Sequence, residues 1–210
     1  MNRINKILAL LKKEYPKTTT ALKFRNPLEI LVATILSAQC TDVRVNIVTK
    51  ELFKKYKTAS DYAEADLKKF ELQIRSTGFY HNKAKNILAS AKMVVDKFGG
   101  LVPDSMEKLI QLPGVARKTA NIVLAHGYGK VEGIAVDTHV RRLSQRLGLT
   151  KNTDPEKIEA DLMKITDKKE WASLSDLLIA HGRAICIAKK PKCLECVLNR
   201  ICPSKKIFYG

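Results

Sequence analysis

The sequence contains few cysteines, no long apolar run and no cleavable leader, and each of these absences excludes a class of protein. Only five of the 210 residues are cysteine, and four of them fall at or after position 186, so a disulfide-stapled secreted fold is excluded. The most apolar stretch, PLEILVATILSA, stops at Gln39 and is too short to span a membrane. No small-residue cleavage site follows INKILALLKK, which argues against a signal peptide. We therefore expect a cytoplasmic protein with reduced thiols.

Acidic residues are also scarce. Lys and Arg total 38 against 21 Asp and Glu, which gives a net charge of +17 and a pI near 9.7. The basic residues are concentrated at both ends of the chain, where residues 1–25 contain one acid, Glu14, and residues 181–210 contain one, Glu195. A solvated lysine-rich surface is one explanation, but nucleic acid is the commoner partner of so basic a protein.

Helical periodicity runs through almost the whole chain. Asn26 before Pro27 predicts a helix start, and apolar residues at helical spacing follow it. Further helices are predicted over 43–56, 59–70, 82–98 and 154–166, and Asp104 with Glu107 has the spacing of a capping box. Only VEGIAV, at 131–136, leaves a strand open. The pattern predicts an all-α fold with short connections, with a central helical body and a basic part formed by both termini.

Four cysteines near the end of the chain predict a metal site. Cys186, Cys193, Cys196 and Cys202 have the spacing C-x6-C-x2-C-x5-C, while Cys40 lies far away. Structural zinc usually takes two short C-x2-C clips. A single clip with wide spacings favours a larger [4Fe-4S] cube, although zinc remains the alternative. Lys189, Lys190 and Lys192 in the first loop would favour thiolates and could face a phosphate backbone.

The segment LPGVARKTANIVL, at 112–124, predicts a tight turn between two amphipathic helices. Backbone N–H groups from Gly114 to Ala116 are expected to be free at a positive helix end, which suits a phosphate and requires no base sequence. A plain helix-turn-helix connection is the alternative. Arg117 and Lys118 then lie in the first helical turn, where a cation is disfavoured.

Lys118 is a candidate nucleophile. The adjacent Arg117 and the helix N-terminus should both lower its pKa, and a neutral amine can attack an electrophilic carbon. GIAVDTHVRR, at 133–142, supplies a carboxylate, Asp137, at an expected helix start. Asp137 could cap that helix, orient or deprotonate Lys118, or stabilise a cation that develops on a sugar.

These motifs, in this order, resemble the endonuclease III family of bifunctional DNA glycosylase/AP lyases in the helix-hairpin-helix superfamily. LSAQCTD at 36–42 and STGFYHNKAKNI at 76–87 are similar to its DNA-facing loops. The resemblance implies a six-helix barrel domain over 20–130 that contains the hairpin, and a second domain of residues 1–19 and 131–210 that holds a [4Fe-4S] cluster. It also implies a monomer that acts on damaged double-stranded DNA at the nucleoid.

The resemblance also implies residue roles. Lys118 falls on the nucleophile, Asp137 on the essential carboxylate and the four cysteines on the cluster ligands. Gln39 and Phe79 fall on the two residues that enter the duplex, with Phe79 where leucine is common, and Ala116 replaces the second glycine of the hairpin. The expected DNA contacts are Gln39, Phe79, Gly114, Ala116, Arg117, His139, Arg142, Lys189, Lys190 and Lys192.

The implied reaction is excision of oxidised pyrimidines, followed by Schiff-base formation and β-elimination. A monofunctional adenine or mismatch-thymine glycosylase of the same superfamily is one alternative, although such enzymes generally lack the hairpin lysine. A non-catalytic, metal-stapled DNA-binding module is another. That module would explain the charge, the hairpin and the cysteines, but not the pairing of Lys118 with Asp137.

Overall fold

The computed structural model describes residues 2–209, which form two compact helical units. We call Thr20–Glu132 the central unit, and the segments up to Thr19 and from Gly133 onward the terminal unit. Every regular element in residues 2–209 is a helix, and 131–136 forms no strand, so the all-α prediction is confirmed. No helix in this range is long and apolar enough to cross a membrane.

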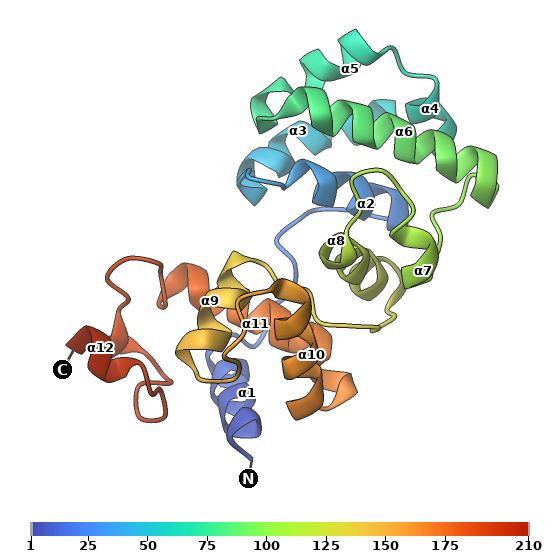
Figure 1. The fold of residues 1–210 in the computed structure, drawn as a ribbon. Coiled ribbons are helices and arrows are strands. Elements are labelled where there is room, and N and C mark those ends of the chain that lie inside the picture. Colours follow the sequence, from blue (N-terminus) through green and yellow to red (C-terminus); the bar gives the residue numbers. More distant parts are fainter. Residues whose placement is uncertain (1, 210) are drawn as a thin grey trace. The chain divides into compact units, whose positions relative to one another are not determined.

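Several helices of the central unit pack against α6 (Figure 1). This helix, Tyr80–Phe98, packs against α2, α4 and α5 and against the short helix η1. The elements of the unit are α2 (Pro27–Leu36), α3 (Asp42–Lys55), α4 (Ala59–Ala63), α5 (Leu67–Ile74), η1 (Arg75–Thr77), α6, α7 (Met106–Leu109), α8 (Arg117–Ile122) and the π-helical turn η2 (Val123–Gly127). Their apolar faces bury one continuous core.

Helix α2 begins as predicted and is the most deeply buried helix of this unit. The Asn26 side chain accepts the Glu29 N–H at 2.9 Å, and Pro27 is the first helical residue. All residues from Glu29 to Leu36 are buried, as expected for a helix that is apolar on every side.

Two sequence predictions in this unit were wrong. The helix predicted over 59–70 is two helices, because α4 ends at Ala63 and the Asp66 side chain accepts the Lys69 N–H to start α5. The capping box predicted from Asp104 is also absent. Ser105 is the N-cap of α7, while the carboxylate of Asp104 pairs with the ammonium of Lys130.

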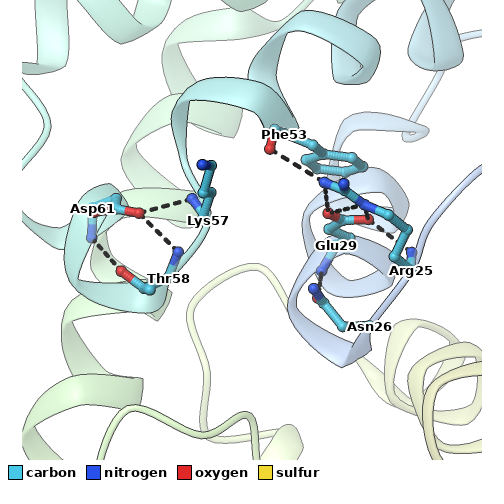
Figure 2. A network of polar contacts seen from close by, with 7 residues as sticks. All are labelled: Arg25, Asn26, Glu29, Phe53, Lys57, Thr58 and Asp61. Carbon is cyan, nitrogen blue, oxygen red and sulfur yellow. Dashed lines mark hydrogen bonds and ion pairs between the residues drawn. The ribbon is translucent and has the colours of Figure 1, made fainter.

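A buried carboxylate fixes the entry to α2. Figure 2 shows Glu29 beside Arg25, whose guanidinium donates to both carboxylate oxygens and to the Phe53 carbonyl at 3.3 Å. The Arg25 backbone N–H also donates to Glu29, at 2.7 Å.

Figure 2 also shows the capping box of α4, in which Thr58 and Asp61 satisfy each other's backbone N–H groups. Both networks use side chains to satisfy N–H groups at helix starts.

The terminal unit packs α11 against α9 and α1. Its core includes Ile7, Leu11, Val140, Leu174 and Leu178. Its elements are α1 (Arg3–Glu14), α9 (Thr138–Arg146), α10 (Pro155–Ile165), η3 (Lys168–Glu170), α11 (Trp171–Ala184), η4 (Cys193–Glu195) and α12 (Lys205–Tyr209). Asp154 caps α10 before Pro155, close to the helix predicted over 154–166.

The Glu29 network predicts a measurable contribution to stability. Glu29→Ala leaves a backbone N–H and a guanidinium without their acceptor, and we expect the free energy of unfolding to fall by about 2 kcal/mol in urea titrations. Glu51→Ala removes an exposed ion pair with Lys54 and is the matched control, for which we expect almost no change. Equal losses in the two variants would contradict the role given to Glu29.

Candidate functional site

The predicted hairpin lies between α7 and α8, and α6 supports it. Val115 is buried in the core of the central unit, as predicted. Gly114 has φ +76°, and a Cβ at this position would lie 2.8 Å from the Cβ of Asn86 on α6. One turn further along α6, the Ser90 hydroxyl donates to the Pro113 carbonyl at 2.7 Å. Only glycine fits position 114, because both its backbone conformation and this close approach exclude a side chain.

One part of the predicted phosphate cradle was wrong. The Val115 N–H is not free, because it donates to the Leu112 carbonyl at 3.0 Å and closes the turn. Ala116 is the N-cap of α8 in an extended conformation, with φ −91° and ψ 171°. An alanine adopts this conformation without strain, so the backbone here does not require the glycine that Ala116 replaces.

Lys118 is the second residue of α8 and is exposed, whereas Arg117 before it is half-buried. Helix α8 is anchored by the buried residues Ala120 and Asn121. The lysine side chain therefore projects from the surface of the central unit, and its backbone is held by a packed helix.

Asp137 is the N-cap of α9, which confirms the capping role predicted for it. Its Oδ1 accepts the N–H groups of His139 and Val140, both at 2.8 Å. The preceding residues from Ile134 to Val136 are buried, and the Ser175 hydroxyl on α11 donates to the Ala135 carbonyl at 2.8 Å. The carboxylate is thus fixed from both sides. It belongs to the terminal unit, whereas Lys118 belongs to the central unit.

Arg142 has an internal role that the sequence did not reveal. Its guanidinium donates to the carbonyls of Gly182 at 2.9 Å and Cys186 at 3.1 Å, and to His139 Nδ1 at 3.1 Å. Burial lowers the pKa of His139, in keeping with a neutral ring that accepts from arginine. The DNA contacts expected of His139 and Arg142 stay predictions.

The remaining candidate contacts are all exposed. Gln39 and Phe79 have positive φ values of 52° and 48°, and the Phe79 side chain is unusually accessible for an aromatic, at 63%. Lys189, Lys190 and Lys192 are exposed in the loop between the first two cysteines of the cluster motif, and Lys190 also has positive φ.

The four C-terminal cysteines line one pocket of the terminal unit. The pocket opens to solvent, and its lining also includes Arg146, His181, Lys192 and Lys205. Cys40 belongs to the central unit, where it packs against the apolar core. Within residues 2–209, no group of three or more His, Cys, Asp or Glu side chains is arranged to hold a single metal ion.

Two of the thiols in this pocket have raised pKa values. Burial raises the pKa of Cys196 to about 11 and also raises that of Cys193, and nearby thiolates add to both shifts. Cys193 and Cys196 therefore resist ionising unless a bound metal stabilises their thiolates. Four sulfur donors on one pocket are the donor set of a thiolate-ligated iron–sulfur cluster.

Two residues that contact the cysteines were missed in the sequence. Arg146 donates to Cys186 Sγ at 3.4 Å and to the Ile187 carbonyl at 2.8 Å. His181 Nε2 lies 3.2 Å from Cys196 Sγ, and its Nδ1 lies 3.0 Å from the Tyr15 hydroxyl. Burial lowers the pKa of His181 to about 4, so the neutral ring can accept from tyrosine and donate to sulfur. Arg146 lies on α9 and His181 on α11, and no sequence motif indicates that either side chain contacts a cysteine.

Comparisons with known proteins agree with this geometry. The family model described as HhH-GPD superfamily base excision DNA repair protein matches residues 32–168. The chain is 55% identical to endonuclease III of Synechocystis over 96% of this chain and 92% of the relative, and 37% identical to that of Escherichia coli over 95% and 94%.

Solved structures extend the agreement to the fold. A structure described as a non-covalent endonuclease III–DNA complex matches with a TM-score of 0.93 and 45% identity, over 98% of this chain and 96% of the other. A structure described as a trapped endonuclease III–DNA covalent intermediate matches equally well. This chain belongs to the endonuclease III family of the HhH-GPD superfamily of base excision DNA repair proteins.

Proposed function

We propose that this chain excises oxidised pyrimidines from damaged double-stranded DNA and then cleaves the resulting abasic site. It is a base excision repair enzyme that combines DNA glycosylase and AP lyase activities. The observation that carries the proposal is an exposed lysine, Lys118, on the packed hairpin of a chain that closely matches a trapped enzyme–DNA covalent intermediate. A covalent intermediate needs a nucleophile, and an amine is the group that forms a Schiff base.

Lys118 acts as the nucleophile. Its Nζ, as the free amine, attacks C1′ of the damaged nucleotide, and the C1′–N bond breaks as the base leaves with the bonding electrons and takes up a proton. The attached amine loses a proton, and its lone pair then breaks the C1′–O4′ bond while O4′ takes up a proton, which leaves a protonated Schiff base between Nζ and C1′. Loss of a proton from C2′ then expels the 3′ phosphate by β-elimination, and water releases the lysine.

Asp137 stabilises the positive charge that develops on the sugar as the base departs. Its position supports this role, because two backbone N–H groups and a buried preceding segment fix the carboxylate before substrate binds. A preorganised charge needs no rearrangement during the reaction.

DNA binding uses both backbone and side chains. N–H groups at Gly114 and Ala116, with the positive charge of Arg117, hold a phosphate. Gln39 and Phe79 enter the duplex in place of the extruded nucleotide and offset part of the unstacking cost. The exposed loop lysines and Arg142 on α9 add positive field along the backbone, and the neutral ring of His139 contacts the DNA beside them.

Cys186, Cys193, Cys196 and Cys202 hold a [4Fe-4S] cluster. When bound, the cluster would supply positive iron centres that stabilise the four thiolates, and the four ligands would link the end of α11 to the C-terminal loop. Arg146 and His181 hydrogen-bond the ligand sulfurs, as outer groups of a metal site commonly do. We further propose that the two units are the two domains of a monomer that works at the nucleoid.

Lys118→Gln tests the proposed nucleophile. The variant retains the hairpin but has no amine, so we expect no covalent adduct when borohydride is added to an abasic-site duplex, while duplex affinity is retained. Wild type gives the adduct. Adduct formation by Lys118→Gln would assign the chemistry to another amine, and absence of an adduct with wild type would favour a monofunctional glycosylase or a non-catalytic binder.

Substitution of Asp137 separates its two roles. Asn is as good a helix cap as Asp, so we expect Asp137→Asn to unfold near the wild-type temperature but to excise base about 100-fold more slowly or worse. Asp137→Ala also loses the cap and should cost about 1 kcal/mol of stability. If Asp137→Asn keeps full single-turnover excision, the carboxylate has only a capping role.

Replacing one cysteine tests the metal centre. Cys186→Ser should lose the broad violet absorbance and the bound iron of the purified protein, because four thiolates are needed to retain the cube. Cys40→Ser, outside the pocket, is the matched control and should keep both. Stoichiometric zinc in place of iron in wild type would establish the alternative metal.

A further inference from the structure

Helix α6 begins with a buried lysine that the proposed chemistry does not use. Lys83 lies in the first turn of α6 and is only 4% exposed. A cation is disfavoured at a helix N-terminus and in an apolar interior, and burial lowers the pKa of this ammonium. Its retention there needs a compensating interaction.

That interaction is with the ends of two other helices. Lys83 Nζ donates to the carbonyl of Leu36, the last residue of α2, and to that of Thr77, the last residue of η1, both at 2.8 Å. Carbonyls at helix C-termini have few intrahelical partners and attract cations. One ammonium thus joins two segments that are 41 residues apart in sequence (77 − 36).

Each of these segments leads directly to a strained exposed residue. Gln39 follows Leu36 by three positions and Phe79 follows Thr77 by two. Only three non-glycine residues among 2–209 have positive φ, and these are two of them. The Lys83 backbone contributes as well, because its N–H donates to the Phe79 carbonyl at 3.1 Å. Non-glycine residues adopt this conformation only when their surroundings impose it.

We propose that Lys83 is a positioning residue that holds the Gln39 and Phe79 loops in one fixed relation, so that both side chains can enter the duplex together. The proposal rests on the proposed function, in which Gln39 and Phe79 enter the duplex. When a nucleotide is extruded from duplex DNA, side chains must fill the space that it leaves. A nucleotide in a single strand has no paired base, so no such space has to be filled. Lys83 should therefore matter for duplex substrates and not for the reaction of Lys118 itself.

Borohydride trapping on two substrates tests this assignment. Lys83→Met is compared with wild type on an abasic site in a duplex and on the same site in a single-stranded oligonucleotide. We expect the duplex-to-single-strand ratio of trapping rates to fall about 10- to 100-fold, with the single-strand rate nearly unchanged. Lys97→Met, which removes an exposed lysine in the last turn of the same helix, should leave the ratio unchanged, and Lys83→Arg should restore it in part.

A second comparison separates positioning from general support. In a chain with Gln39→Ala and Phe79→Ala, Lys83→Met should lower the ratio little further, because the residues it positions are gone. An unchanged ratio for Lys83→Met, an equal fall on both substrates, or a full further loss in the Gln39/Phe79 double variant would overturn the proposal.

Protein folding is monitored by circular dichroism and thermal unfolding. If Lys83→Met does not fold, Lys83→Gln, which is uncharged and too short to reach both carbonyls, is judged by the same ratio. If neither folds, the lysine is a structural residue and the proposal is overturned. The wild-type adduct on both substrates reports on Lys118, so failure of the proposed function is seen in wild type, whereas failure of the Lys83 assignment is seen only in the ratio.

Discussion

The burial of one face of α6 is the constraint on which the functional surface of the central unit depends. This helix packs against α2, α4, α5 and η1. The face that packs against them carries a few polar side chains among the apolar ones. Lys83 binds the ends of α2 and η1, Ser90 binds the Pro113 carbonyl, and Asn86 lies against Gly114. One helix therefore sets the positions of the Gln39 loop, the Phe79 loop and the hairpin. All three surface features are therefore linked by hydrogen bonds or close contacts to α6.

Polar side chains in both units mainly form hydrogen bonds with backbone N–H and C=O groups at helix ends, which have no partner within the helix. Glu29 accepts a backbone N–H before α2, and Asp137 accepts two at the start of α9. Arg142 and Arg146 instead donate to carbonyls in the last turn of α11 and just after it. A chain built from short helices has many such ends, and each unsatisfied group in the interior costs stability. At Asp137 these hydrogen bonds also hold the carboxylate in one position.

In the cysteine pocket, the surrounding residues affect the ionisation of the thiols and form hydrogen bonds with the sulfur atoms. Thiols that are buried near one another resist ionisation, and metal ligation requires the thiolate. Arg146 and the Tyr15–His181 pair supply hydrogen bonds to two of the sulfurs. The neutral state of His181 follows from its burial, so its hydrogen bond to sulfur does not depend on the imidazole gaining a proton. In the proposed metal centre these outer groups would orient the cysteine ligands.

The sequence by itself determined the all-α class, the Asn26–Pro27 helix start, the buried Val115, the Asp137 cap and the grouping of the four cysteines, because each depends on local spacing or on the chemistry of one side chain. It also carried enough motifs to indicate the family. Tertiary structure alone decided the break between α4 and α5, the pairing of Asp104 with Lys130, and the closure of the hairpin by the Val115 N–H. It also decided the roles of Lys83, Arg142, Arg146 and His181. Their partners are carbonyls and sulfurs distant in sequence, and no pattern along the chain records which distant backbone group a buried cation or ring will reach.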